Sequence, residues 1–140
     1  QRIDAIQIPY NVLDQRLDRC HFFACAKKNH KEIFARSAFL QGLLLMSPME
    51  AEQKVRGSGS YVGCFQEIAD EHHLSPSEAA MLFSIVHPQI DYTVFGVDTA
   101  KQLTDNLKIG EKISHFSMCY DKLRSTFQDV PKKIIVPSLW

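Results

Sequence analysis

The residues best placed to do chemistry lie around positions 96–102, where an apolar run leads directly into the start of a helix. Gly96 would let the backbone turn sharply, and Thr99 stands three residues before Gln102 in the order of a capping box. The first turn of a helix has backbone N–H groups without partners and the positive end of the helix dipole. The segment therefore predicts a phosphate or other anion site, although most capped helices bind nothing.

The histidines and cysteines do not predict a metal site. His72 and His73 end a predicted helix, where positive charge suits the dipole. His21 shares a helix with Cys20 and Cys25 but lacks the ligand spacing that zinc needs. No CxxC pair occurs among the four cysteines, so we expect reduced, mostly buried thiols in a cytoplasmic protein. The GxSxG, P-loop and GxGxxG fingerprints are absent.

Three apolar runs, each followed by helical periodicity, predict the strands that position these residues. The runs cover residues 3–8, 32–35 and 92–97. Because they are apolar on both sides rather than alternating, we expect parallel strands that are covered on both faces. The order strand, helix, strand, helices, strand, helices is typical of an α/β fold with right-handed crossovers.

Helix signals fall between and after these strands. Residues 14–28 are expected to form one helix, which ends before Asn29 and carries Leu17, Cys20, Phe23 and Ala24 on one face. Residues 56–60 are expected to form a flexible loop. Further helices are indicated by capping boxes at Ser47, Ser75 and Thr99, and by a stripe of Ile113, Phe116, Tyr120, Leu123 and Phe127.

Composition limits the remaining possibilities. The chain has 140 residues, of which 45% are hydrophobic; this describes one soluble globular domain and is too short for a complete α/β barrel of about 250 residues. Sixteen basic and sixteen acidic residues cancel, which argues against nucleic acid or an anionic membrane as a partner. The longest apolar stretch, residues 42–46, is too short to span a bilayer.

Arg2 and Asp4 interrupt the first apolar run, so we expect no signal peptide. The start at Gln1 leads us to expect a fragment of a longer chain.

Three segments, in this order and spacing, are similar to the aldo-keto reductase family. Residues 6–11 (IQIPYN) match the sixth barrel strand, and residues 35–44 (ARSAFLQGLL) match the seventh strand and its exit loop. Residues 96–106 (GVDTAKQLTDN) match the eighth strand and the cofactor-phosphate loop. The resemblance implies a partial (β/α)8 TIM barrel over residues 1–140, with about three parallel βα units and extra C-terminal helices.

The resemblance also implies a nicotinamide cofactor at the ends of these strands. Gln7 would hydrogen-bond the nicotinamide carboxamide, because its side-chain amide both donates and accepts; the alternative is a strand Gln that bonds a neighbouring loop. Arg36 stands where many members stack an aromatic ring on the nicotinamide, or is simply a surface arginine. The other matches are Ser37, Phe39 and Gly42 along the pyrophosphate, Gly96, Val97, Asp98 and Thr99 in the phosphate loop, and Gln102 and Asn106 at the adenosine end.

Cofactor preference depends on positions 96–98, which are small, apolar and acidic where NADP-preferring members carry basic or hydroxyl residues. Asp98 would repel a 2′-phosphate and could accept hydrogen bonds from ribose hydroxyls, whereas Lys101 lies nearby and could offset that charge. We therefore expect NAD rather than NADP, or poor discrimination between them.

The resemblance implies hydride transfer to a carbonyl carbon, with a Tyr as general acid assisted by Lys, Asp and His. In family order all four come from the first half of the barrel, so no catalytic residue is expected in this chain, and neither Tyr10 nor Lys31 is recruited as a substitute.

One hypothesis is a piece of a reductase that needs the missing N-terminal half. The others are a non-catalytic nucleotide-binding or interaction protein, or a domain without surviving function. Alone, the chain should not reduce carbonyls and should self-associate through open sheet edges.

Overall fold

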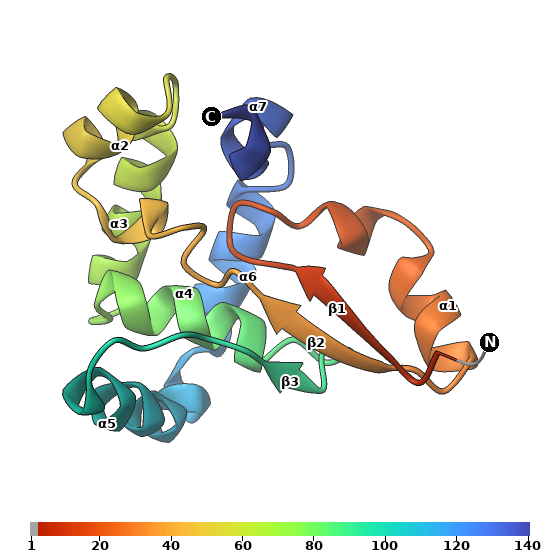
Figure 1. Ribbon diagram of the computed structural model, residues 1–140. Helices are drawn as coiled ribbons and strands as arrows, with labels where there is room; N and C mark the ends of the chain where they lie inside the picture. The colour runs from red at the N-terminus through yellow and green to blue at the C-terminus, as the bar shows by residue number, and fades with distance from the viewer. Residues whose placement is uncertain (1–2) are drawn as a thin grey trace.

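The three predicted strands form one parallel sheet in the order β1-β2-β3, as Figure 1 shows. The computed structural model describes residues 3–140, apart from the side chain of His115. Gln1 and Arg2, on which two of the sequence expectations depend, lie outside the described residues. The strands are β1 (Ala5–Pro9), β2 (Glu32–Arg36) and β3 (Tyr92–Thr93). This arrangement confirms the α/β class and the parallel pairing.

The third strand is much shorter than residues 92–97, which was the prediction. After Thr93, the Val94 N–H still donates to the Ala35 carbonyl at 2.7 Å, and there the pairing ends. The physical reason lies in β2, because its backbone turns away at Ser37, where φ is 66°. Residues 94–97 therefore leave the sheet and run along the edge of a hollow.

The sheet is covered on one face and open on the other. Ile8, Ile33 and Ala35 are buried beneath helices, whereas Gln7 and Tyr92, which lie in register on the other face, are exposed. The expectation of cover on both faces was therefore wrong for the described chain. This second face mixes the polar Gln7, Glu32 and Arg36 with the stacked rings of Phe34 and Tyr92.

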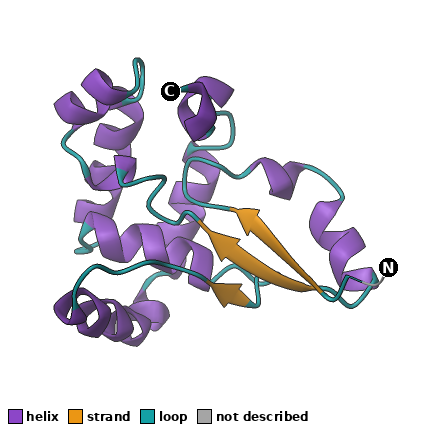
Figure 2. Ribbon diagram, in the orientation of Figure 1, coloured by secondary structure: helices purple, strands orange, loops and turns teal. Residues whose placement is uncertain are grey.

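Helices connect and follow the strands, and Figure 2 shows them gathered around the small sheet. Their N-termini agree with the sequence signals, because capping boxes are formed at Ser47, Ser75 and Thr99. The elements are η1 (Arg16–Arg19), α1 (Phe22–Lys28), η2 (Leu43–Leu45), α2 (Pro48–Lys54), α3 (Gly59–Glu71), α4 (Pro76–Ile85), α5 (Ala100–Lys108), η3 (Ile109–His115), α6 (Ser117–Thr126), α7 (Lys132–Ile135) and η4 (Pro137–Leu139).

Two helix predictions need correction. Residues 14–28 form a short 3-10 turn and a separate α1 rather than one helix, because Cys20 adopts an extended conformation between them. The break changes the phase of the buried stripe, so that Phe23 and Ala26 are buried while Ala24 is exposed. The expected loop at 56–60 is also shorter, because α3 already begins at Gly59.

All four cysteines are free thiols, but they are not mostly buried as expected. Cys119 is buried and Cys64 is half-buried, whereas Cys20 and Cys25 are exposed. The two exposed thiols belong to the broken helical segment, whose core contacts are made by neighbouring residues. Only the α6 thiol contributes fully to the hydrophobic core.

A buried polar cluster ties the exit of β1 to the helical layer. The Tyr10 hydroxyl donates to one Asp18 carboxylate oxygen at 2.9 Å, and His87 Nε2 lies 3.0 Å from the other. The Gln89 N–H donates to His87 Nδ1, so the proton of a neutral His87 ring is on Nε2 and points to Asp18. Burial alone would raise the pKa of the Asp18 carboxyl, but the hydrogen bonds from His87 and Tyr10 outweigh it and hold the pKa below its ordinary value.

We predict that Asp18→Asn lowers the free energy of unfolding at neutral pH by about 2 kcal/mol, because hydrogen bonds to a charged acceptor are lost. The folded-state pKa of Asp18 is depressed, so its contribution is present above pH ~4 and is lost as the pH falls through the folded pKa. Urea titrations from pH 3 to 7 should show the gap between wild type and variant closing in acid. The exposed Asp129→Asn serves as the control, and an equal effect in both variants would contradict the assignment.

Candidate functional site

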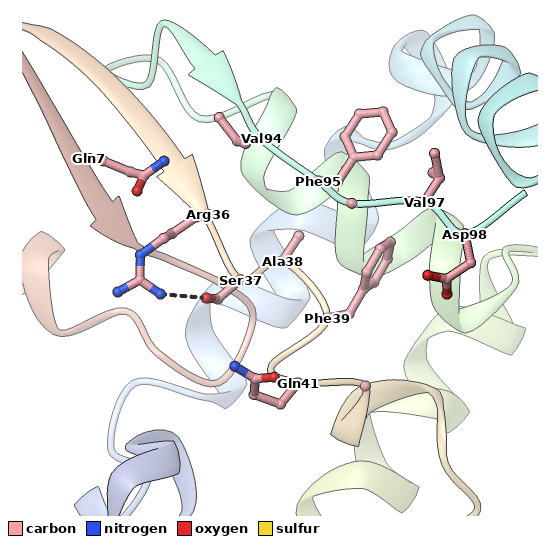
Figure 3. Close-up of a pocket in the computed structure, with 12 residues that line it drawn as sticks. Gln7, Arg36, Ser37, Ala38, Phe39, Gln41, Val94, Phe95, Val97 and Asp98 are labelled. Carbon is pink, nitrogen blue, oxygen red and sulfur yellow. Dashed lines mark hydrogen bonds between the residues drawn. The ribbon is translucent and has the colours of Figure 1, made fainter.

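The carboxyl ends of the strands open onto a cleft of about 720 Å³. Its two long walls are the loop after β2 and the segment after β3, which face each other in Figure 3. Eight of the eleven residues that the sequence singled out line it, together with Ala38, Gln41, Val94 and Phe95: Gln7, Arg36, Ser37, Phe39, Gly42, Gly96, Val97 and Asp98. The parallel sheet has thus brought residues almost a hundred positions apart into one cleft.

A second hollow, of about 350 Å³, continues from the far end of the cleft. Phe39, Gly96, Val97 and Asp98 line both, so the two spaces adjoin. The second hollow adds Gln102 and Asn106 from α5, with Leu45, Ser77 and Asp105. Thr99, the last of the predicted site residues, lines neither hollow and instead caps α5.

The loop after β2 has an unusual backbone. Ser37, Leu40, Gln41 and Gly42 all have positive φ, between 47° and 78°. Only Gly adopts this region without steric cost, and each other residue there costs roughly 1–2 kcal/mol. Such strain is found where a functional geometry must be held, and Ser37, Gln41 and Gly42 of this loop line the cleft.

Both walls of the cleft also carry backbone donors without acceptors. Within the part of the chain that the structure describes, the N–H groups of Phe39, Gln41 and Gly42 make no hydrogen bond, nor do those of Gly96 and Val97. These free donors belong to residues that line both walls of one cleft, and backbone N–H groups in turns can form anion-binding concavities. The cleft lining therefore offers free backbone donors beyond the helix N-terminus that the sequence indicated.

At the strand end of the cleft, Gln7 and Arg36 provide the polar side chains. Both are exposed, and the Arg36 guanidinium donates to Ser37 Oγ at 3.1 Å. Figure 3 shows no hydrogen bond between the Gln7 amide and the other residues that line the cleft. A free amide and a guanidinium at this point can bind a group that both donates and accepts.

The backbone conformation at position 96 does not require a glycine. Its φ is not positive, and a Cβ added there would meet no atom within 4 Å. The expected sharp turn is therefore absent, and a side chain at Gly96 would project into open space within the two hollows. The glycine keeps that space free.

The side chains at the start of α5 are largely engaged with one another. Gln102 Oε1 accepts from the Asp98 N–H at 2.8 Å and from the Thr99 N–H at 3.3 Å. Lys101 Nζ pairs with Asp105 at 2.5 Å, so it is neutralised by that carboxylate and not by Asp98. The second hollow therefore contains the carboxylate of Asp98 without an offsetting cation among the described side chains that line it.

The lining contains no residue of the kinds that usually transfer protons to a carbonyl oxygen. No Tyr, Lys or His is among the described residues of the cleft. Tyr10 is fully buried and bonded to Asp18, and burial raises the pKa of its hydroxyl well above the ordinary value. Among described residues no group of His, Cys, Asp and Glu could hold a metal ion. No described helix has the length and apolar character to cross a membrane.

The sequence model of the Aldo/keto reductase family matches residues 1–119. The chain belongs to the aldo/keto reductase family. Among solved structures it is similar to a thermostable aldo-keto reductase, Tm1743, determined in complex with the inhibitor epalrestat. That likeness has a TM-score of 0.60 at 20% identity, over 86% of this chain, and supports the fold. No curated protein sequence matched.

The chain spans 39% of the length of that solved structure. Together with the three parallel strands, this identifies the fold as a partial TIM barrel, as expected. Less than half of that solved structure therefore has a counterpart in this chain.

Several lining residues were missed by the sequence argument. Ala38 and Gln41 stand inside the matched segment 35–44 but carried no assigned role, and Val94 and Phe95 had been assigned to a strand. Ser77 and Asp105 are helical positions that reach the second hollow only through packing. The left-handed backbone at Leu40 and Gln41 could not be predicted from the sequence, because Leu and Gln rarely adopt positive φ.

We predict that Gln41→Gly leaves the free energy of unfolding unchanged or raises it by up to about 1 kcal/mol. Relief of the left-handed strain, roughly 1–2 kcal/mol, outweighs the entropy that a glycine adds to the unfolded chain. Gln53→Gly, at an exposed position of α2, is the matched control and should cost about 1 kcal/mol. Urea unfolding of both variants measures the difference; equal losses would show that the loop is unstrained.

Proposed function

We propose that residues 1–140 are the C-terminal part of an NAD(P)-dependent aldo-keto reductase and supply the seat of the nicotinamide cofactor. The observation that carries the proposal is the continuous lining of two adjoining hollows by ten of the eleven residues that match the family's cofactor positions. The cofactor would supply a hydride to a carbonyl carbon, while the carbonyl oxygen takes up a proton, giving an alcohol and the oxidised cofactor.

The proposed positions follow the cleft from one end to the other. Gln7 and Arg36 would hold the nicotinamide, with the Gln7 amide on the carboxamide. The pyrophosphate would lie between the free N–H groups of the two walls, beside Ser37, Phe39, Gly42, Gly96 and Val97. The adenosine end would occupy the second hollow, beside Asp98, Gln102 and Asn106, where Gln102 must also keep its cap on α5 with Thr99.

We further propose NAD rather than NADP as the preferred cofactor. Asp98 lines both hollows, and its negative charge would oppose a 2′-phosphate but accept hydrogen bonds from ribose hydroxyls. Lys101 cannot offset this charge while it pairs with Asp105. The free cysteines favour a reducing, cytoplasmic setting.

A non-catalytic nucleotide-binding or interaction protein is the second candidate. The observation in its favour is the absence of Tyr, Lys and His from the described lining of the cleft. Under either candidate this chain alone would not reduce a carbonyl, since the proton donor would have to come from the missing N-terminal half of a barrel.

The deciding experiment is a titration of the chain with NADH and with NADPH, followed by nicotinamide fluorescence. We expect saturable binding, with NADH bound more tightly, and we expect Asp98→Ser to reduce the difference by about tenfold, because one like charge is removed. Gly96→Val should abolish binding without altering the fold, since its side chain would fill space meant for ligand.

Gly110→Val is the matched control, because a Cβ added at Gly110 would also meet no atom within 4 Å, although Gly110 lies outside both hollows. Binding that survives Gly96→Val would place the cofactor elsewhere. Absence of binding by the wild-type chain would leave the interaction protein as the better candidate.

We also expect the isolated chain to self-associate. Neither outer edge of the sheet, on β1 or on β3, pairs with a further described strand, and Leu107 on α5 is 69% exposed. Light scattering after size exclusion should therefore give a mass above 16.0 kDa. Leu107→Gln should shift the population toward monomer and Met49→Gln, on the distant α2, should not; a monodisperse wild-type monomer would refute the expectation.

A further inference from the structure

The loop after β2 keeps its backbone carbonyls bonded although several of its N–H groups are free. Carbonyls at five positions of this loop accept hydrogen bonds within the described chain: Ser37, Phe39, Leu40, Gln41 and Gly42. Four of the five accept from backbone N–H groups three to five residues further along. The Gln41 carbonyl accepts instead from Lys54 Nζ of α2, at 3.2 Å. The direction of this peptide group therefore depends on a side chain from another element.

The Gln41 carbonyl and the Gly42 N–H belong to the same peptide group. This peptide bond is trans and planar, so its C=O and its N–H point in opposite directions. Gln41 and Gly42 line the cleft, whereas Lys54 lines neither the cleft nor the second hollow. By drawing the carbonyl outward, Lys54 turns the free Gly42 N–H away from itself and toward the cleft.

The Lys54 ammonium is itself held in place by Trp140. Nζ lies 5.5 Å from the centre of the Trp140 ring, within the range of a cation–π contact. The indole N–H of Trp140 donates to the carbonyl of Ile134, a buried residue of α7, at 3.1 Å. Figure 1 shows α2 and α7 at the same end of the molecule. The ring thus fixes the ammonium relative to the hydrophobic core.

The charge of Lys54 is not neutralised by the chain. No ion pair joins Lys54 to a carboxylate among the described residues. A cation on the carbonyl side of a peptide group polarises that group, which makes its N–H a stronger donor. The Gly42 N–H is therefore both directed and strengthened by Lys54.

We propose that Lys54 is a positioning residue for the pyrophosphate of the bound cofactor, a role that rests on the proposed function. Lys54 does not touch the anion. It acts through the peptide group of Gln41 and Gly42, whose N–H would donate to a phosphate oxygen. The α2 helix, which contributes no residue to the lining of the cleft or the second hollow, would in this way set the affinity of the cleft for its ligand.

The test follows the Gly42 amide by proton–nitrogen correlation NMR during titration with inorganic pyrophosphate and, separately, with NADH. We expect both ligands to shift the Gly42 resonance in a saturable way. Lys54→Met, which keeps the apolar stem beside Trp140, should weaken the binding of both by about fivefold, because an oriented donor is lost. Lys54→Arg, which keeps a cationic donor, should restore most of the affinity.

A further measurement separates positioning from a purely structural role. In the ligand-free chain, Lys54→Met should already shift the Gly42 amide resonance, because the carbonyl of that peptide group has lost its cation. The Gly110 resonance, outside both hollows, and the urea midpoint should stay close to those of wild type. An unchanged Gly42 resonance in this variant would contradict the proposal.

Lys133→Met is the matched control for loss of charge. Lys133 is an exposed lysine of α7 that lines neither hollow. We expect this variant to leave the Gly42 resonance and both affinities as in wild type. Equal weakening by Lys133→Met and Lys54→Met would reduce the effect to overall charge and overturn the inference.

Failure of this inference and failure of the proposed function give different results. If NADH binds wild type and Lys54→Met equally well, the cofactor seat stands and the role of Lys54 is refuted. If pyrophosphate binding depends on Lys54 but neither NADH nor NADPH binds, Lys54 still positions an anion donor and the cofactor proposal fails. If neither pyrophosphate nor NADH shifts the Gly42 resonance of the wild-type chain, Lys54 positions no anion donor and the inference is wrong.

Discussion

The structure depends on parallel pairing of three short strands. Parallel pairing requires each strand to run the same way, so every strand must end at the same edge of the sheet and return through helices. The register places Gln7 beside Phe34 and Phe34 beside Tyr92, which aligns the strand ends to within a residue or two. The exit loops of β2 and β3 therefore converge beside Gln7 of β1, and the cleft is the space between them.

Features set by local chemistry could be predicted from the sequence. The capping boxes at Ser47, Ser75 and Thr99 involve residues three apart, and all three begin helices. The early end of β3 could not, because it depends on the distant turn of β2 at Ser37. The break at the extended Cys20, which precedes the exposed Cys25, was also not predicted. The apolar pattern of residues 3–8 and 32–35 located the strands but did not reveal that one face stays open.

The candidate site also combines features that the sequence could predict with features that it could not. The candidate residues were identified by matching short segments to a family, and the fold gathers nearly all of them around two hollows. Electrostatic detail needed coordinates, since only the structure pairs Lys101 with Asp105 and leaves Asp98 without a cation. A further hollow of about 300 Å³ was beyond sequence reasoning, because residues 135–138 line it together with Pro9 and Arg36 from the distant strand ends.

The strained loop after β2 has a consequence for how the chain exchanges hydrogen with solvent. Its N–H groups at Phe39, Gln41 and Gly42 have no acceptor in the described chain, so nothing within the fold slows their exchange with deuterium. An oxyanion that settles between the cleft walls would become their first acceptor. The loop thus holds a built-in reporter of occupancy: these amides should pass from unprotected to protected on binding while the β1-β2 ladder stays unchanged. A backbone conformation that costs stability would in this way distinguish the empty cleft from the filled one.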